Sequence, residues 1–288
     1  MSASEHVFPP KLVGRYDVVD GRVQTRSLEA HVVDHCNLKC AECCSLSPLL
    51  PPWFADPKDL AADLDAAAAV LAPGLFKIVG GEPTLHPELV ELVRVARRSK
   101  IARAVSVTTN GLLLDRLPDA LWQAVDALTI SLYPAPALSS SSTEVIEAKA
   151  RQFDVKLNWK KQDEFVRMNR QDAGGKGICV DDDENQRVYD ACWLRERCHI
   201  LRDGRFFTCT RPPHFHSWFQ SRGAESEFND DGLALKGSSV DDVVAYLKRP
   251  HPLKACAHCH GGSAPMGPHR QMTRDEVRAQ TSSLKILP

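Results

Sequence analysis

The sequence has neither an excess of charge of one sign nor a long apolar run. Its 288 residues include 36 Lys and Arg and 37 Asp and Glu, a formal net charge of −1. Bulk nucleic-acid binding needs a concentrated positive field, so it is not expected. The longest nearly apolar run, Ala66–Phe76, is far too short to span a membrane, and residues 1–27 lack the apolar core of a signal peptide. We expect a cytoplasmic protein without a nucleic-acid or membrane partner.

Apolar strand-like runs alternate with helical patterns between residue 28 and about residue 160. The pattern predicts helices after Asp56-Pro57, after Pro87, over 115–125 and after the capping-box sequence Ser141–Glu144. Repeated strand–helix units predict an α/β fold with a parallel sheet, either an incomplete barrel or an open wound sheet. The expected strands cover 28–33, 75–79, 104–108, 127–133 and 155–159.

The composition changes near residue 170. Gly174–Gly177 and the acidic run Asp181–Glu184 indicate a solvated loop, and Asp203-Gly204 between apolar runs predicts a β-hairpin. A helix is expected over Ser239–Leu247, and the last 20 residues are polar and expected to be loosely ordered. The expected organisation is an N-terminal extension (1–27), a core barrel (28–170), a small hairpin-plus-helix domain (171–265) and a C-terminal tail (266–288).

The ten cysteines fall into two groups. Four lie within nine residues, from Cys36 to Cys44, and five lie within 68 residues, from Cys192 to Cys259, with Cys179 apart. A cytoplasmic protein keeps its thiols reduced, so clustered cysteines indicate metal binding or catalysis more than disulfides. The sequence therefore predicts two metal centres on two parts of the chain.

The first group follows the spacing Cys36-x3-Cys40-x2-Cys43, directly after the first expected strand. Three thiolates cannot saturate a four-iron cluster, which usually takes four, so one iron would stay open for an exchangeable ligand. A zinc site is the competing interpretation, although structural zinc prefers closed fourfold coordination.

A second motif, Gly80-Gly81-Glu82-Pro83, follows the second expected strand. The two glycines would let the backbone approach a ligand closely. Glu82 adds a carboxylate that suits an ammonium group.

In this order, the motifs resemble the radical S-adenosylmethionine (SAM) enzymes over about residues 26–160. The resemblance implies a partial (β/α)6 barrel in which Cys36, Cys40 and Cys43 hold a [4Fe–4S] cluster and SAM binds the open iron. It also implies a 5′-deoxyadenosyl radical that removes hydrogen from an unactivated C–H bond, with an electron donor such as a flavodoxin or ferredoxin.

The resemblance further implies which residues bind SAM. The family often has an aromatic residue before the third cysteine, where this chain has Glu42, so the adenine contact must come from elsewhere. The expected contacts are Gly80, Gly81, Glu82 and Pro83 for the amino group, and Thr109, Asn110 and Ser131 for the carboxylate and ribose.

The second group resembles a twitch domain, a shortened SPASM extension that carries one auxiliary [4Fe–4S] cluster, over about residues 190–262. The expected ligands are Cys192, Cys209, Cys256 and Cys259. Cys198 could replace Cys192, and a zinc ribbon also fits the spacing. The spare thiol is a candidate hydrogen-atom donor to a carbon radical; we expect Cys198 in this role, with Cys44 and Cys179 as alternatives.

The stretch from Asp34 to Cys40, followed by Ser45–Pro48, is similar to members that modify carbohydrates, neomycin-type epimerases among them. The resemblance implies a small-molecule substrate, a sugar or aminoglycoside, that is epimerised with a cysteine as hydrogen donor. Dehydrogenation of an aminocyclitol or alcohol is the alternative, with the auxiliary cluster accepting an electron. A peptide-modifying enzyme is a third possibility, but residues 1–27 are too short for a precursor-binding module.

Overall fold

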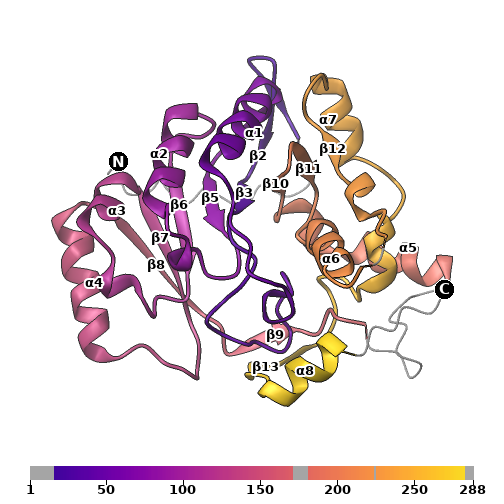
Figure 1. The fold of residues 1–288 in the computed structure, drawn as a ribbon. Helices are drawn as coiled ribbons and strands as arrows, with labels where there is room; N and C mark the ends of the chain where they lie inside the picture. Colours follow the sequence, from indigo (N-terminus) through magenta and orange to yellow (C-terminus); the bar gives the residue numbers. More distant parts are fainter. Residues whose placement is uncertain (1–15, 171–180, 224, 283–288) are drawn as a thin grey trace.

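The computed structural model describes residues 16–170, 181–223 and 225–282 (Figure 1). The expected loop at Gly174–Gly177 and the thiol of Cys179 lie outside these residues. In the described residues, no helix is long and apolar enough to cross a membrane.

An eight-stranded, mostly parallel sheet forms the centre of the fold, in the order β12-β11-β10-β3-β5-β6-β7-β8. All neighbours from β10 to β8 pair in parallel. The predicted α/β fold of a partial barrel is therefore confirmed. The parallel strands are β3 (Leu28–His31), β5 (Phe76–Val79), β6 (Val105–Thr109), β7 (Ala127–Leu132), β8 (Lys156–Lys161) and β10 (Ile200–Arg202).

Four helices connect the strands of the first half: α1 (Pro57–Val70), α2 (Leu89–Ser99), α3 (Asp119–Ala124) and α4 (Ser140–Gln152). As predicted, α1 begins behind the N-cap Asp56, whose side chain accepts a hydrogen bond from Lys58 N. The helix expected over 115–125 is shorter, because Pro118 forms the N-cap of α3 after a separate 3-10 turn. The capping box expected at Ser141 is wrong, since Ser139 caps α4 by accepting from Ser142 N.

The two faces of the sheet differ in character. Alternate residues of β3, β5 and β6 belong to the main apolar core with α1–α4: Leu28, Ala30, Phe76, Ile78, Val105 and Val107. The residues between them are polar and point to the opposite face, because side chains alternate along a strand. Glu29, Lys77 and Ser106 form one such row across the three strands.

The hairpin of the second region joins this sheet. β10 pairs with β11 (Arg205–Phe207) as predicted, but it also lies parallel to β3, with Ile200 opposite Glu29. The helix α7 (Val240–Leu247) begins at the predicted Ser239, which forms a capping box with Asp242. The loop expected at Asp181–Glu184 is instead the start of α5 (Asp182–Ala191), because the Asp181 side chain accepts from Glu184 N. Two further elements are α6 (Arg211–Gln220) and β12 (Leu233–Ala234).

The C-terminal segment is more structured than its polarity suggests. β13 (Met266–Pro268) pairs antiparallel with β9 (Glu164–Val166), and α8 (Arg274–Ser282) follows. Between them, residues 269–272 cross the first cysteine loop, where Cys40 and Gln271 form an antiparallel bridge. A separate small sheet consists of β1 (Val18–Val19), β2 (Arg22–Thr25) and β4 (Leu71–Pro73).

Candidate active site

The first cysteine loop starts just beyond the carboxyl end of β3, the end at which parallel sheets and barrels place their chemistry. Burial raises the pKa of both Cys36 and Cys40 to about 12. Without a metal these thiols therefore stay protonated at neutral pH, so deprotonation would depend on a bound cation.

Hydrogen-bond donors surround the sulfur atoms of this loop. Leu38 N donates to Cys36 Sγ at 3.3 Å, and Gln271 Nε2 donates to Cys40 Sγ at 3.5 Å. The Cys43 Sγ and Ser45 Oγ atoms are 3.3 Å apart. Such donors stabilise thiolates that bind iron. The donor set therefore fits a three-cysteine iron–sulfur site.

The glycine pair after β5 packs against the start of the cysteine loop. Gly81 N donates to Val33 O at 2.7 Å, and Glu82 N donates to His35 O at 3.1 Å. A Cβ at Gly81 would overlap the carbonyl oxygen of His35. The glycine is thus required by the close approach of two segments of the chain itself, where sequence reasoning had considered only a ligand.

Glu82 is buried and its carboxylate has four hydrogen bonds within the chain. Oε1 accepts from Thr109 Oγ1 at 2.6 Å, from Thr84 Oγ1 at 2.7 Å and from Thr84 N at 3.0 Å. Oε2 accepts from Asn110 N at 2.7 Å. Glu82 therefore holds the loops after β5 and β6 together.

Asn110 connects these loops to the first cysteines. Its Nδ2 donates to Asn37 Oδ1 at 2.7 Å and lies 3.9 Å from Cys36 Sγ. The structure thus brings Gly80, Gly81, Glu82, Thr109 and Asn110 together beside the cysteine loop. Pro83 starts the 3-10 turn that carries Thr84. Ser131 lies on the neighbouring strand β7, one residue beyond Ile130, which pairs with Thr109, and its side chain is hydrogen-bonded to Tyr133.

Sequence reasoning missed three residues of this site. Tyr133, Phe165 and His269 form an aromatic group, with ring centroids 4.9 Å apart for Tyr133–His269 and 5.3 Å apart for Phe165–His269. His269 Nε2 is 3.2 Å from Cys40 Sγ. The only sequence signal was the residue types themselves, because these residues come from three distant segments.

The second group of cysteines lines a single cavity between α5, the hairpin and the 3-10 turn over Lys254–His258. Its lining includes Cys192, Cys209, Cys256 and Cys259, the four ligands that the sequence predicted. Burial raises the pKa of Cys256 to about 12 and that of Cys209 well above its usual value. Cys198 does not belong to this lining.

Backbone N–H groups donate to three of these sulfur atoms. Gly262 N donates to Cys192 Sγ at 3.1 Å, and Gly261 N donates to Cys259 Sγ at 3.2 Å. The backbone of Arg211 donates to Cys209. The cavity therefore has the thiols and N–H donors that an iron–sulfur cluster requires. In the described ranges no three His, Cys, Asp or Glu side chains are close enough together to hold a single metal ion. A cluster does not require this, because each of its cysteine ligands binds a different iron.

The two spare thiols of the described chain lie in different places. Cys198 precedes β10, and the parallel register of β10 with β3 places it level with the residues before β3, at the amino ends of these strands. Cys36, by contrast, follows the carboxyl end of β3. Cys44 belongs to the first cysteine loop, and burial raises its pKa to about 12. The structure therefore brings Cys44, and not Cys198, next to the first group.

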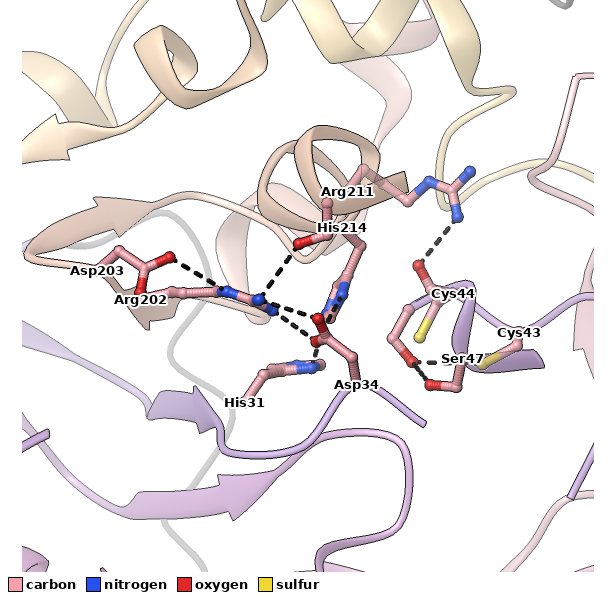
Figure 2. A network of polar contacts seen from close by, with 11 residues as sticks. His31, Asp34, Cys43, Cys44, Ser47, Arg202, Asp203, Arg211 and His214 are labelled. Carbon is pink, nitrogen blue, oxygen red and sulfur yellow. Dashed lines mark hydrogen bonds and ion pairs between the residues drawn. The ribbon is translucent and has the colours of Figure 1, made fainter. Parts of the chain in front are cut away.

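A buried polar network joins β3 to the second region (Figure 2). Arg202 of β10 donates to both carboxylate oxygens of Asp34, at 2.6 and 2.9 Å. His214 of α6 lies 2.7 Å from His31, Nε2 to Nδ1. Asp34 is two residues before Cys36, so this network anchors the start of the cysteine loop to the second region.

Residues 31–133 match the family model described as the Radical SAM superfamily. This part of the chain is therefore a radical SAM domain, and a [4Fe–4S] cluster and SAM are its cofactors, as predicted. The second cluster stays a prediction.

Relatives of the chain include GTP 3′,8-cyclases. That of Chlorobaculum tepidum is 38% identical over 104 residues, which cover 35% of this chain and 31% of that protein. That of Streptomyces coelicolor is 35% identical over 127 residues, with 41% and 36% covered. The chain thus spans about a third of the length of these relatives.

Similar solved structures are more distant in sequence. BtrN in complex with AdoMet and 2-DOIA is 16% identical with a TM-score of 0.47, covering 83% of this chain and 94% of BtrN. SuiB of Streptococcus suis bound to the precursor peptide SuiA is 11% identical with a TM-score of 0.39, covering 78% and 65%.

Proposed function

We propose that the chain is a radical SAM oxidoreductase that dehydrogenates a polar small molecule of the sugar or aminocyclitol type. The observation that carries this proposal is the cavity lined by Cys192, Cys209, Cys256 and Cys259, whose lining residue Arg211 donates to Cys44 O of the first cysteine loop. A second cluster there would supply an electron acceptor, which dehydrogenation requires and epimerisation does not.

The first cysteine loop would bind the SAM-associated cluster, and the loops held by Glu82 would bind SAM. When bound, these cofactors supply a 5′-deoxyadenosyl radical that removes a hydrogen atom from an unactivated C–H bond. The chain's own contribution is to orient the substrate and to exclude competing reactions.

The polar face of the sheet supports a hydroxyl- or amino-bearing substrate. Lys77 Nζ and Glu29 Oε1 form an ion pair at 2.9 Å on this face, and Ser106 Oγ is buried without a partner among the described residues. This row lies toward the amino ends of the strands, beside Cys198, so it would contact a substrate that extends along the polar face from the first cysteine loop.

The proposed reaction converts a carbinol into a ketone. The substrate carbon loses a hydrogen atom to the radical, the hydroxyl proton passes to a base, and the remaining electron leaves toward the second cysteine group. His31 lies on the polar face of β3, but burial lowers its pKa to about 4, so at neutral pH it is an uncharged imidazole that binds a proton only weakly. The hydroxyl proton would therefore pass to water or to a basic group of the substrate.

Epimerisation is the second candidate, favoured by the position of Cys44. Its raised pKa keeps it as a thiol, which can return a hydrogen atom to a carbon radical. Cys44 lies beside the ligands of the first group. Cys198, the donor that the sequence suggested, lies at the other end of the strands.

Anaerobic reconstitution followed by one assay tests both candidates. The protein should bind about eight irons per chain if both clusters contain four. It is incubated with dithionite, SAM and a panel of aminocyclitols, aminoglycosides, sugars and GTP, in water and in heavy water. Release of 5′-deoxyadenosine with a product that has lost two hydrogens supports dehydrogenation.

A product whose mass is unchanged in water, and which gains one deuterium in heavy water, would instead establish epimerisation. Cys44→Ala and Cys198→Ala then identify the donor. Both variants should keep their iron, and only the variant that lacks the donor should lose deuterium incorporation. Turnover of GTP alone would overturn the proposed substrate class.

A further inference from the structure

Arg211 is the first residue of α6, and its side chain extends toward Cys44 (Figure 2). Its side chain donates from one terminal nitrogen to Cys44 O at 2.9 Å, beside the first group. The same residue lines the cavity of the second group, and its backbone N–H donates to Cys209. Arg211 therefore contacts both groups with different atoms.

The positive charge of Arg211 is buried and only partly compensated. The residue is 3% exposed, and its guanidinium lies 4.2 Å from the centroid of the Phe215 ring. Glu42 interacts with it electrostatically, but no ion pair of Arg211 with a carboxylate is found in the described part of the chain. Burial of a charge is costly, so a cation kept here without an ion pair is a candidate for a function. Its Nε–H is also buried without an acceptor among the described residues.

Asn169 completes the connection. It accepts from Arg211 at 2.7 Å through Oδ1 and donates to Glu42 of the first loop at 3.1 Å through Nδ2. Its backbone forms an antiparallel bridge with Cys259 of the second group. The path from Glu42 through Asn169 to Arg211 fixes the guanidinium beside the first loop, while the backbone of Arg211 contacts the second group and the residue lines its cavity.

We propose that Arg211 is a positioning residue that raises the reduction potential of an iron–sulfur cluster held by Cys192, Cys209, Cys256 and Cys259. This inference rests on the proposed function, because it requires the second cluster. Reduction adds one negative charge to a cluster, and a nearby buried cation stabilises that charge with little screening by salt. The unpaired Nε–H would add a hydrogen bond to a cluster sulfur, which acts in the same direction.

The test is a reduction titration monitored by electron paramagnetic resonance. The triple variant Cys36→Ala/Cys40→Ala/Cys43→Ala lacks the first cluster, so the signal comes from the second cluster alone. In this background, Arg211→Gln should shift the midpoint potential to more negative values, and Arg211→Lys, which keeps the charge, should shift it less. Arg195→Gln is the control, since Arg195 lines the same cavity but is partly exposed and stacks on Tyr189.

Each outcome has a defined meaning. An Arg211→Gln variant with full iron and the parent potential overturns the proposal, as does an equal shift in Arg195→Gln. If Arg211→Gln holds no iron, Arg211→Lys must hold iron near the parent potential, and its failure overturns the proposal. A triple variant that folds but binds no iron, where about four per chain are expected, refutes the second cluster and with it the proposed function. If the triple variant does not fold, the intact protein is titrated, and only one of its two signals should move in Arg211→Gln.

Discussion

The two cysteine groups are built in opposite ways. The first comes from one short loop at the end of β3, and only its supporting residues come from distant segments, such as Asn110 and Gln271. The second has its ligands spread from Cys192 to Cys259. Its N–H donors Gly261 and Gly262 are close in sequence to Cys259. A short motif can therefore identify a site without revealing its surroundings, whereas for a dispersed group the fold is needed to show that the segments converge.

The largest expected difference between the groups is chemical. Cys40→Ala removes a ligand of the first cluster, so formation of 5′-deoxyadenosine should fall to background. Cys256→Ala should still form 5′-deoxyadenosine but no oxidised product, because the electron then lacks its acceptor. Chromatography of both products on the reconstituted variants measures this. Oxidised product from Cys256→Ala would show that the second group is dispensable.

The connection between the two regions should matter strongly for stability. Arg202→Gln leaves Asp34 as a buried carboxylate without its cation, and breaking such a pair costs about 3–5 kcal/mol. The exposed pair Arg97–Asp126 is the matched control, and Arg97→Gln should cost about 0.2–1 kcal/mol. Urea unfolding measures both, and equal losses would contradict the anchoring role of Asp34.

Packing of the glycine pair is expected to have a smaller effect on stability. Gly81→Ala places a Cβ on the carbonyl oxygen of His35, and overpacking of this kind costs about 1–3 kcal/mol. It should also weaken SAM binding, because the loops of the first group separate. Gly237→Ala strains only a left-handed turn, φ +85°, with no atom within 4 Å of the new Cβ. Equilibrium dialysis should find normal SAM binding in Gly237→Ala, and normal binding in Gly81→Ala would contradict the prediction.

The smallest effect concerns pH and is expected in both regions. Burial lowers the pKa of His31 on β3 and of His199 before β10 to about 4, from 6.5. The unfolded chain binds protons that the folded chain does not, so the free energy of unfolding should fall as pH drops from about 6.5 toward 4. Each histidine accounts for about 1–2 kcal/mol by pH 5. His31→Asn and His199→Asn should each flatten this dependence, and an unchanged slope would refute it.

Much of the first region was predictable, because its information is local. The strand periodicity predicted β3, β5, β6, β7 and β8 to within about two residues, and Asp56 predicted the start of α1. The cysteine spacing and the glycine pair identified the radical SAM domain. Glu82 was recognised, but its four partners were not, because they depend on how the loops after β5 and β6 meet.

The second region shows the limit of sequence reasoning. The hairpin turn at Asp203-Gly204 was evident, but the pairing of β10 with β3 joins residues about 170 positions apart, which no local pattern specifies. The start of α5 was interpreted as a loop because its acidic run looks solvated, although acidic residues also favour a helix N-terminus. Arg211 and Asn169 carried no motif at all.

The segment 269–272 is synthesised long after the cysteine loop that it crosses. Residues 36–43 leave the ribosome more than 200 residues earlier than this segment, which forms an isolated bridge with them at Cys40. Until residues 269–272 have been made, Cys40 lacks the hydrogen bond from Gln271 and the contact with His269. This side of the cysteine loop is therefore covered only after the strands from β3 to β12 have been synthesised.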